Sequence, residues 1–430
     1  MSVESPLARV NHAGDASSVG LPSDTLLHND RNDFAPRIGI AYRPLANTVV
    51  RAGFGIFYDQ TPQLNNPTIG SPFAISEPTF TNPAASPTVI LPLIYPAGTA
   101  APTVVNPPGS RNPNMVNPYS MQYSATVEHQ HWNTGFRVSY IGTNTRKGMY
   151  AYDINQPIPN TLPYAAKAVA YPYIPGSLSY GTNGAGHQYN SGTFEANHTF
   201  RNGLTYQFAY TLARDIGDLE GGQSLENAYD RKRERAVWTD VQTHQVKSFV
   251  VYELPVGKGR RFAANSNRLV NAAIGGWNIS SLLYINSGNF LTPLWSGPDP
   301  TGTRYTSSGT APVVSLRPNE LQNPNLPPDQ RTVSRWFNVQ AFGAPSPGSF
   351  GTAPKGAIIG PGSWLLDSGV FKIIDIYERV KFRVEMTGTG VLNHPNWSDP
   401  NTTITSTGTV GVITGATGAR SLRFGGRLEW

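Results

Sequence analysis

The sequence ARSLRFGGRLEW, residues 419–430, ends the chain and alternates between two faces with the period of a β-strand. One face carries large apolar side chains, and the other carries two arginines and a glutamate. The apolar positions are Leu422, Phe424, Leu428 and Trp430. An aromatic last residue is typical of a strand whose apolar face contacts lipid and whose final ring lies at the membrane interface.

The composition favours a β-rich protein with long loops. Among 430 residues there are 43 glycines and 37 prolines, and only 14% of the chain is charged, which argues for many turns and against helices. The chain has no cysteine, which excludes disulfides, thiolate metal sites and a cysteine nucleophile. A modest, dispersed net charge of +6 makes nucleic acid an unexpected partner. No apolar run is long enough for a transmembrane helix.

The alternation recurs in pairs of stretches joined by short turns. In residues 50–58, Val50, Phe54 and Tyr58 share one face, and Arg51 lies on the other. Similar pairs occur at 121–141, 193–212 and 369–387, and single stretches follow the same pattern, for example 246–252 and 277–285. The pattern predicts about twelve antiparallel strands, each with the roughly ten residues that a tilted membrane strand requires.

The connections between these stretches alternate in length along the chain. Short turns are predicted at 44–47, 131–133, 201–203 and 376–378, with an intermediate connection at 255–275. Long loops are predicted at 59–117, 145–186, 214–241, 289–364 and 393–418. This sorting predicts an all-β, antiparallel transmembrane β-barrel with short periplasmic turns and long extracellular loops. A soluble sandwich has no reason to sort its loops in this way.

The N-terminal segment differs from the rest of the chain. Residues 1–33 lack periodicity and are expected to be a loop or a truncated edge, ahead of one partial barrel domain over residues 34–430. Residues 1–20 are polar and lack the apolar segment of a signal peptide, so an exported chain of this kind is expected to be a fragment of a longer one.

Several phrases of the sequence resemble one family of membrane proteins. They include NDFAPRIGIAYRP, TVVRAGFGIFYD, NAYDRKRERAVW, GGWNISSLLYINSGNF and VLNHPNWSDPNTT. These phrases resemble TonB-dependent receptors, specifically the Oar-like group that carries an N-terminal carboxypeptidase-regulatory-like domain. The resemblance extends from about residue 32 to residue 430 and implies the C-terminal half of a 22-stranded barrel, without the plug and TonB box.

The resemblance implies that the protein lies in the outer membrane of a Gram-negative cell and is not an enzyme. Its implied function is energy-coupled uptake of an unidentified solute, with the TonB complex as a partner through the missing N-terminal region. The C-terminal strand resembles the signal read by the barrel assembly machinery, although that signal usually ends in Phe and here ends in Trp430. A passive porin-like channel or a stand-alone barrel remains an alternative; a secreted all-β carbohydrate-binding protein is disfavoured by the sorted loops.

Candidate site residues follow from the predicted faces and loops. Because charge on the lipid face is costly, the polar side chains are expected to line the lumen: Arg37, Arg51, Arg137, Glu195, Asn197, Gln207, Lys247, Lys381, Arg383, Glu385, Arg423, Arg427 and Glu429. Loop aromatics that could contact a ligand are Tyr171, Tyr173, Tyr180, Trp295 and Tyr305. No catalytic motif and no compact set of metal ligands occurs, so no cofactor is expected.

An incomplete barrel leaves the backbone groups of its first and last strands unpaired, and lipid does not tolerate such edges. The chain by itself is therefore expected either to close into a smaller barrel or to form an open, strongly curved sheet.

Overall fold

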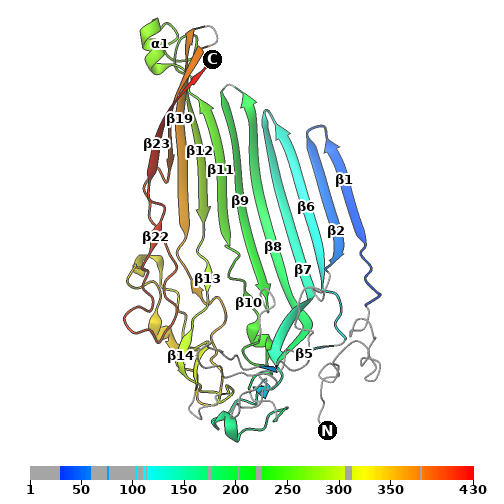
Figure 1. The fold of residues 1–430 in the computed structure, drawn as a ribbon. Helices are drawn as coiled ribbons and strands as arrows, with labels where there is room; N and C mark the ends of the chain where they lie inside the picture. Colours follow the sequence, from blue (N-terminus) through cyan, green and yellow to red (C-terminus); the bar gives the residue numbers. More distant parts are fainter. Residues whose placement is uncertain are drawn as a thin grey trace, which may run out of the picture.

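A computed structural model describes residues 30–59, 75–76, 103–104, 110–112, 114–172, 176–201, 203–218, 225–305, 312–377 and 380–430. One antiparallel sheet dominates this part of the chain, and its eleven long strands neighbour one another in sequence order (Figure 1). They are β1 (Arg37–Leu45), β2 (Thr48–Tyr58), β6 (Tyr119–His131), β7 (Thr134–Asp153), β8 (Ser179–Arg201), β9 (Leu204–Gly217), β11 (His244–Glu253), β12 (Trp277–Asn286), β19 (Ser363–Tyr377), β20 (Val380–Thr389) and β23 (Ser421–Glu429).

The predicted hairpins and the alternation of short turns with long loops are confirmed, but the number of long strands is eleven, one below the expected number. The described loops add only short strands, such as β14 (Trp295–Pro298) and β15 (Val313–Leu316), which are four residues long and too short to cross a bilayer. With an odd number of strands, β1 starts at the long-loop end of the sheet, and β23 finishes at the short-turn end (Figure 1).

The sheet is open, which is the second of the two expected outcomes. Among the described residues, β1 pairs with β2 alone and β23 pairs with β20 alone. The two strands lie at opposite edges of the sheet (Figure 1). Each edge therefore presents a row of backbone groups without a neighbouring strand, a surface suited to pairing with further strands.

The hairpin of β7 and β8 corrects the prediction of a long loop at 145–186. The two strands have 20 and 23 residues and pair as far as Asp153 and Ser179, so the connecting loop is only 154–178. A membrane strand needs about ten residues, so both strands have about twice the length required to cross a bilayer. Outside lipid neither face has to be apolar, and the alternation that identified the strands disappears although the pairing continues.

The register of the sheet places all thirteen predicted lumen residues on one face. Directly opposed residues share a face, and one row of opposed residues across β7, β8, β9 and β11 is Arg137, Glu195, Ala209 and Lys247. Opposed residues on the same face can be followed further through β12 and β19 to β20 and β23. There Lys381 opposes Glu429 and Arg383 opposes Arg427. We call this surface the polar face.

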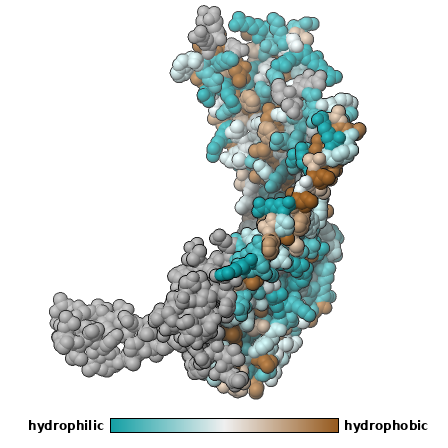
Figure 2. All heavy atoms as spheres, turned by 90° about the vertical axis from the view of Figure 1, so that its right-hand side faces the viewer, coloured by the Kyte–Doolittle hydropathy of each residue, from teal (hydrophilic) through white to brown (hydrophobic). Residues whose placement is uncertain are grey.

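The opposite surface, the apolar face, exposes large hydrophobic side chains along the whole sheet. Its exposed members include Ile38, Ile40, Tyr42, Phe54, Val127, Phe136, Val138, Phe194, Leu212, Ile285, Leu422, Phe424 and Leu428. From the side of β1, Figure 2 shows hydrophobic patches between hydrophilic ones on the described surface. The eleven residues of β2 cover roughly 33 Å, or about 25 Å of bilayer at a tilt near 40°, which matches the apolar band of a membrane barrel.

The long-loop end of the sheet contains its own packed cores. One cluster in the β12–β19 connection is formed by Phe337, Ala341, Phe342, Ala353 and Ile358. A second joins Val314, Leu316 and Phe350, with Trp295 packed against it. The loops are thus folded structures and give the residues on them defined positions. None of the helices in the described part has the length and apolar content needed to cross a bilayer.

Candidate functional site

A row of ion pairs crosses the polar face. Glu128 of β6 pairs with Arg51 of β2, and its Oε1 accepts a hydrogen bond from Arg137 Nε at 3.0 Å. Arg137 Nη1 reaches Glu195 Oε2 on β8 at 3.1 Å. Alternating charges therefore link four neighbouring strands. Three of these residues were predicted, whereas Glu128 was missed, although it directly opposes Arg137 across the β6–β7 turn.

The other predicted lumen residues form separate groups on the same face. Asn197 and Gln207 oppose each other, and both line a depression of about 400 Å³ that also contains Glu195 and Lys247. The Arg37 guanidinium lies 4.6 Å from the centre of the Phe57 ring. This part of the face is therefore polar and of mixed charge.

The last two strands carry close pairs of charges on the polar face. Arg383 Nε donates to Glu385 Oε2 at 2.7 Å, and Arg427 Nε lies 3.3 Å from Glu429 Oε1. Arg423 lines a depression of about 350 Å³ between the neighbouring strands. The predicted charges thus occur as opposite-sign neighbours rather than as one surface of a single sign.

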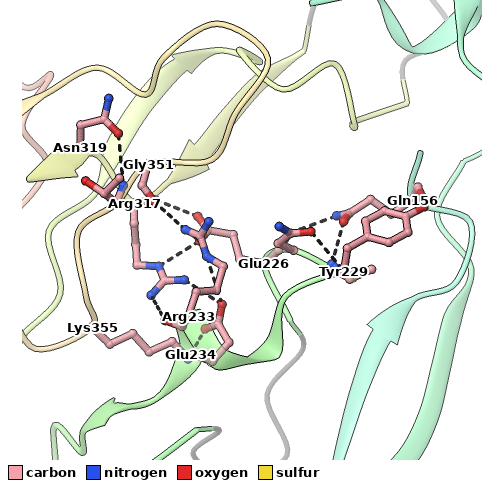
Figure 3. A network of polar contacts seen from close by, with 12 residues as sticks. Gln156, Glu226, Tyr229, Arg233, Glu234, Arg317, Asn319, Gly351 and Lys355 are labelled. Carbon is pink, nitrogen blue, oxygen red and sulfur yellow. Dashed lines mark hydrogen bonds and ion pairs between the residues drawn. The ribbon is translucent and has the colours of Figure 1, made fainter. Parts of the chain in front are cut away.

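At the long-loop end, a buried ionic network joins separate connections (Figure 3). Arg317 of the β12–β19 connection binds two carboxylates of the β9–β11 connection: its Nε donates to Glu226 Oε2 at 2.9 Å, and its Nη2 donates to Glu234 Oε1 at 2.7 Å. Its Nη1 donates to the Arg233 carbonyl at 2.9 Å. The Arg317 guanidinium therefore has an acceptor at each of its nitrogens.

Further charges surround this pair. Glu234 is 1% exposed and also binds Lys355 Nζ at 3.0 Å. Arg233 Nη2 donates to Glu226 Oε2 at 2.7 Å and to the Gly351 carbonyl at 2.8 Å. Burial lowers the pKa of Arg233 below its usual value, while the nearby Glu226 carboxylate acts in the opposite direction. Two acidic and three basic side chains thus form one largely buried network with an excess of one positive charge.

The β7–β8 connection joins the same network through Gln156 (Figure 3). Its side chain donates to the Glu226 carbonyl at 3.1 Å and accepts from the Ala228 amide at 2.8 Å. The Tyr229 hydroxyl donates to the Gln156 carbonyl at 2.6 Å, and burial and the charge of Asp153 raise the Tyr229 pKa. Three connections that are distant in the sequence are therefore held together.

A cavity of about 560 Å³ lies among these connections, within the size range of small-molecule sites. Its charged lining residues are Asp153, Glu226, Glu234, Arg304, Arg317 and Lys355. Polar side chains such as Ser177 and Ser315 complete its wall. With three acidic and three basic residues, the cavity can offer both donors and acceptors to a polar ligand.

The predicted loop aromatics do not gather at one place. Tyr171 is buried, and Trp295 packs on the core of Leu316 and Phe350. The Tyr180 ring meets Tyr152 edge-on, with centroids 5.4 Å apart. Tyr305 is 44% exposed and meets Tyr164 at 5.5 Å. Tyr173 lies outside the described residues.

Three of the four predicted residues of the C-terminal signal, Leu422, Phe424 and Leu428, share the apolar face of the edge strand β23 (Ser421–Glu429), and Trp430 follows the strand. Phe424 and Trp430 are 79% and 89% exposed, and Leu422 and Leu428 are about half exposed. Their side chains are therefore open to lipid or to a protein that reads this strand.

The loop network was not predicted because loops carry no periodicity. The run RKRER at 231–235 was the available signal, since five consecutive charged residues in a loop usually require partners. The carboxylate and arginine that complete the network, Glu226 and Arg317, are 91 residues apart, and no local pattern connects them.

Glu320, in the same loop assembly, makes the stability of the assembly depend on pH. Burial raises the pKa of the Glu320 carboxyl in the folded loop above the usual 4.5, which is the pKa expected in the unfolded loop. At a pH between the unfolded and the folded pKa, the folded loop therefore binds more protons than the unfolded loop. Its contribution is therefore lost as pH rises through the raised pKa. We expect Glu320→Gln to slow hydrogen exchange of the loop amides at pH 7 but not at pH 4. An equal effect at both pH values would contradict this account.

The sequence and the structure were compared with known proteins. A family model described as outer membrane beta barrel domain matches residues 5–423. Solved structures that the chain matches include the ferripyoverdine receptor of the outer membrane of Pseudomonas aeruginosa, at 9% identity and a TM-score of 0.42 over 92% of this chain and 33% of that chain. The ferric preacinetobactin receptor BauA from Acinetobacter baumannii shows 10% identity and a TM-score of 0.40, over 92% of this chain and 36% of that one.

No protein with curated annotation matches the sequence. The chain spans about a third of the length of the solved structures that it matches. The family model covers nearly the whole chain, and the sheet has the sorted loops and the apolar face of a membrane barrel. The chain therefore belongs to the outer membrane beta-barrel domain family.

Proposed function

We propose that the chain is the C-terminal barrel portion of a TonB-dependent outer-membrane receptor of the Oar-like group, which takes up a solute with energy coupling. The observation that carries this proposal is the folded loop assembly at one end of the sheet. Two connections are joined there by buried ion pairs, and a third is joined to them by hydrogen bonds of Gln156, around a polar cavity. A receptor requires such a defined binding surface, whereas a passive channel requires an unobstructed mouth.

In this proposal, the two faces of the sheet lie in different environments. The apolar face contacts outer-membrane lipid, and the thirteen charged and amide side chains of the polar face line the lumen. The ion pairs from Arg51 to Glu195 support this orientation, because arginine on the lipid side would cost about 2–4 kcal/mol near the midplane. The missing barrel strands would pair with β1 and β23.

The solute is expected to be polar and to bind first at the loop end. The 560 Å³ cavity supports this, as does its balanced set of acidic and basic groups. Of the described aromatic candidates, Tyr305 is exposed and Tyr180 is partly buried beside Tyr152, while Tyr171 and Trp295 pack within the loops. Energy would come from the TonB complex through an N-terminal region, and the barrel assembly machinery would read Phe424 and Trp430.

Energy coupling can be tested in cells that express the complete gene product. The cells are given labelled solutes from a fixed panel of ferric chelates, cobalamin and oligosaccharides, and accumulation is measured with and without a protonophore and in a TonB deletion. We expect accumulation of at least one solute to fall to background in both treatments. Accumulation that continues unchanged would identify a passive channel instead.

A further inference from the structure

The connection between β11 and β12 differs from the other described turns at the short-turn end. It comprises residues 254–276, of which Lys258, Arg260, Arg261 and Arg268 are basic and none is acidic. It contains the helix α1 (Arg268–Ile274), which Figure 1 shows beside the C-terminus at this end of the sheet. The prediction of an intermediate connection is thus confirmed, but its helix was missed because seven residues are too few for a clear helical period.

The C-terminal turn of α1 is fastened to the apolar face of the sheet. Lys372 of β19 lies on that face, directly opposite Trp277, and its Nζ donates to the Ala272 carbonyl at 2.5 Å. Trp277 Nε1 donates to the Ala273 carbonyl at 2.9 Å. A cation at the carboxyl end of a helix is favourable, and here the helix also covers a lysine that lipid would otherwise surround. Lys372 is only 5% exposed as a result.

The remainder of α1 faces outward with apolar side chains. Leu269 is 83% exposed and Val270 is 42% exposed, while Ile274 and Phe262 are also exposed. Lys258 and Arg268 flank them as exposed cations, and Arg260 is paired with Glu253 at 2.6 Å. Apolar and basic side chains therefore occur together on the exposed surface of this connection.

We propose that residues 254–276 anchor the barrel in the periplasmic leaflet by binding anionic phospholipid: Leu269, Val270 and Phe262 insert beside the acyl chains, and Lys258, Arg261 and Arg268 contact phosphate groups. The inference rests on the proposed orientation of the barrel. A bilayer is the occupant that fits, because lipid already meets the apolar face on which α1 lies, and the connection has the net positive charge that anionic headgroups attract.

The absence of cysteine makes this placement directly measurable with single spin labels. The complete gene product carrying Leu269→Cys, with any cysteine outside residues 1–430 replaced by serine, is labelled and inserted into vesicles of phosphatidylethanolamine and phosphatidylglycerol, and collision with oxygen and with a water-soluble nickel reagent is compared. Val138→Cys on the apolar face is the lipid control, and Leu321→Cys, exposed in a long loop, is the water control. We expect the Leu269 label to collide preferentially with oxygen, as the Val138 label does.

The basic side chains are tested by Lys258→Gln, Arg261→Gln and Arg268→Gln together, in the Leu269→Cys background. Each cation near an anionic surface contributes about fivefold to binding. We therefore expect the ratio of inserted to water-exposed label to fall more than tenfold in the triple variant. With the basic residues unchanged, we expect a similar fall in this ratio when phosphatidylglycerol is replaced by phosphatidylcholine.

The controls separate the two proposals. A Leu269 label in water beside a Val138 label in lipid would overturn the anchor and leave the barrel orientation intact. A Val138 label in water would overturn the orientation itself. A Leu269 label that is exposed in vesicles but protected in cell outer membranes would assign the surface to a protein partner and also overturn the anchor.

Discussion

Arg317→Met is expected to open the loop assembly and leave the sheet folded. The substitution keeps the aliphatic volume but leaves Glu226 and Glu234 without their shared guanidinium, and Glu234 is 1% exposed. Removing one partner of a buried pair typically costs about 3–5 kcal/mol. Arg233 and Lys355 still pair with the two carboxylates, so we expect a loss near the lower end of that range. A loss of this size is comparable to or larger than the free energy of local opening of a folded loop, so the loop assembly is expected to open.

Hydrogen exchange of the loop amides measures this loss, and heat-dependent mobility on gels reports whether the barrel itself remains. Arg335→Met is the matched control, since Arg335 is an exposed arginine of the same connection. It should change the free energy of loop opening by less than about 0.5 kcal/mol. Equal protection in both arginine variants would show that the network does not hold the loops.

Val138→Arg is expected to destabilise the membrane-inserted sheet by about 2–4 kcal/mol. Val138 lies midway along the apolar run of β7, between Phe136 and Tyr140, and is 57% exposed on the apolar face. An arginine there must either lose its hydration in hydrocarbon or distort the bilayer to reach water. Neither is required of the valine that it replaces.

Ser139→Arg provides the matched control one residue away at the same depth. Ser139 lies on the polar face, where Glu128 and Glu195 are diagonal neighbours in the register. We expect its effect on the free energy of unfolding to stay below about 1 kcal/mol. Urea unfolding in lipid vesicles, followed by tryptophan fluorescence, gives both values. Similar losses for the two variants would mean that the two faces do not have different surroundings.

The strands and their faces could be predicted because the relevant information is local. In a membrane strand, lipid favours apolar side chains on one face and polar surroundings favour polar side chains on the other. The type of a residue, such as Phe424 or Arg423, therefore indicates the face on which it lies. This rule placed all thirteen predicted polar residues on one face of the observed sheet. It also located the hairpins, since short turns interrupt the alternation.

The same rule fails wherever lipid is absent. Beyond the bilayer, β7 and β8 keep their backbone pairing through Asp153 and Ser179, but nothing there requires alternating side chains. In the β11–β12 connection, the helix α1 is held on the sheet by a hydrogen bond from Lys372, a residue about 100 positions later in the chain. Neither feature could be recognised from the residues next to it.

By itself, the sequence determined the strand order, the two faces and the alternation of turns and loops, because a two-residue period reports the surroundings of each side chain. Only the tertiary structure decided which loops meet. The contact of Arg317 with Glu226 and Glu234 arises from the order of strands in the sheet, which brings the β9–β11 and β12–β19 connections together at one end. Buried charges specify such contacts by pairing with one another. A pair formed by distant loop residues produces no periodic pattern in the sequence from which it could be predicted.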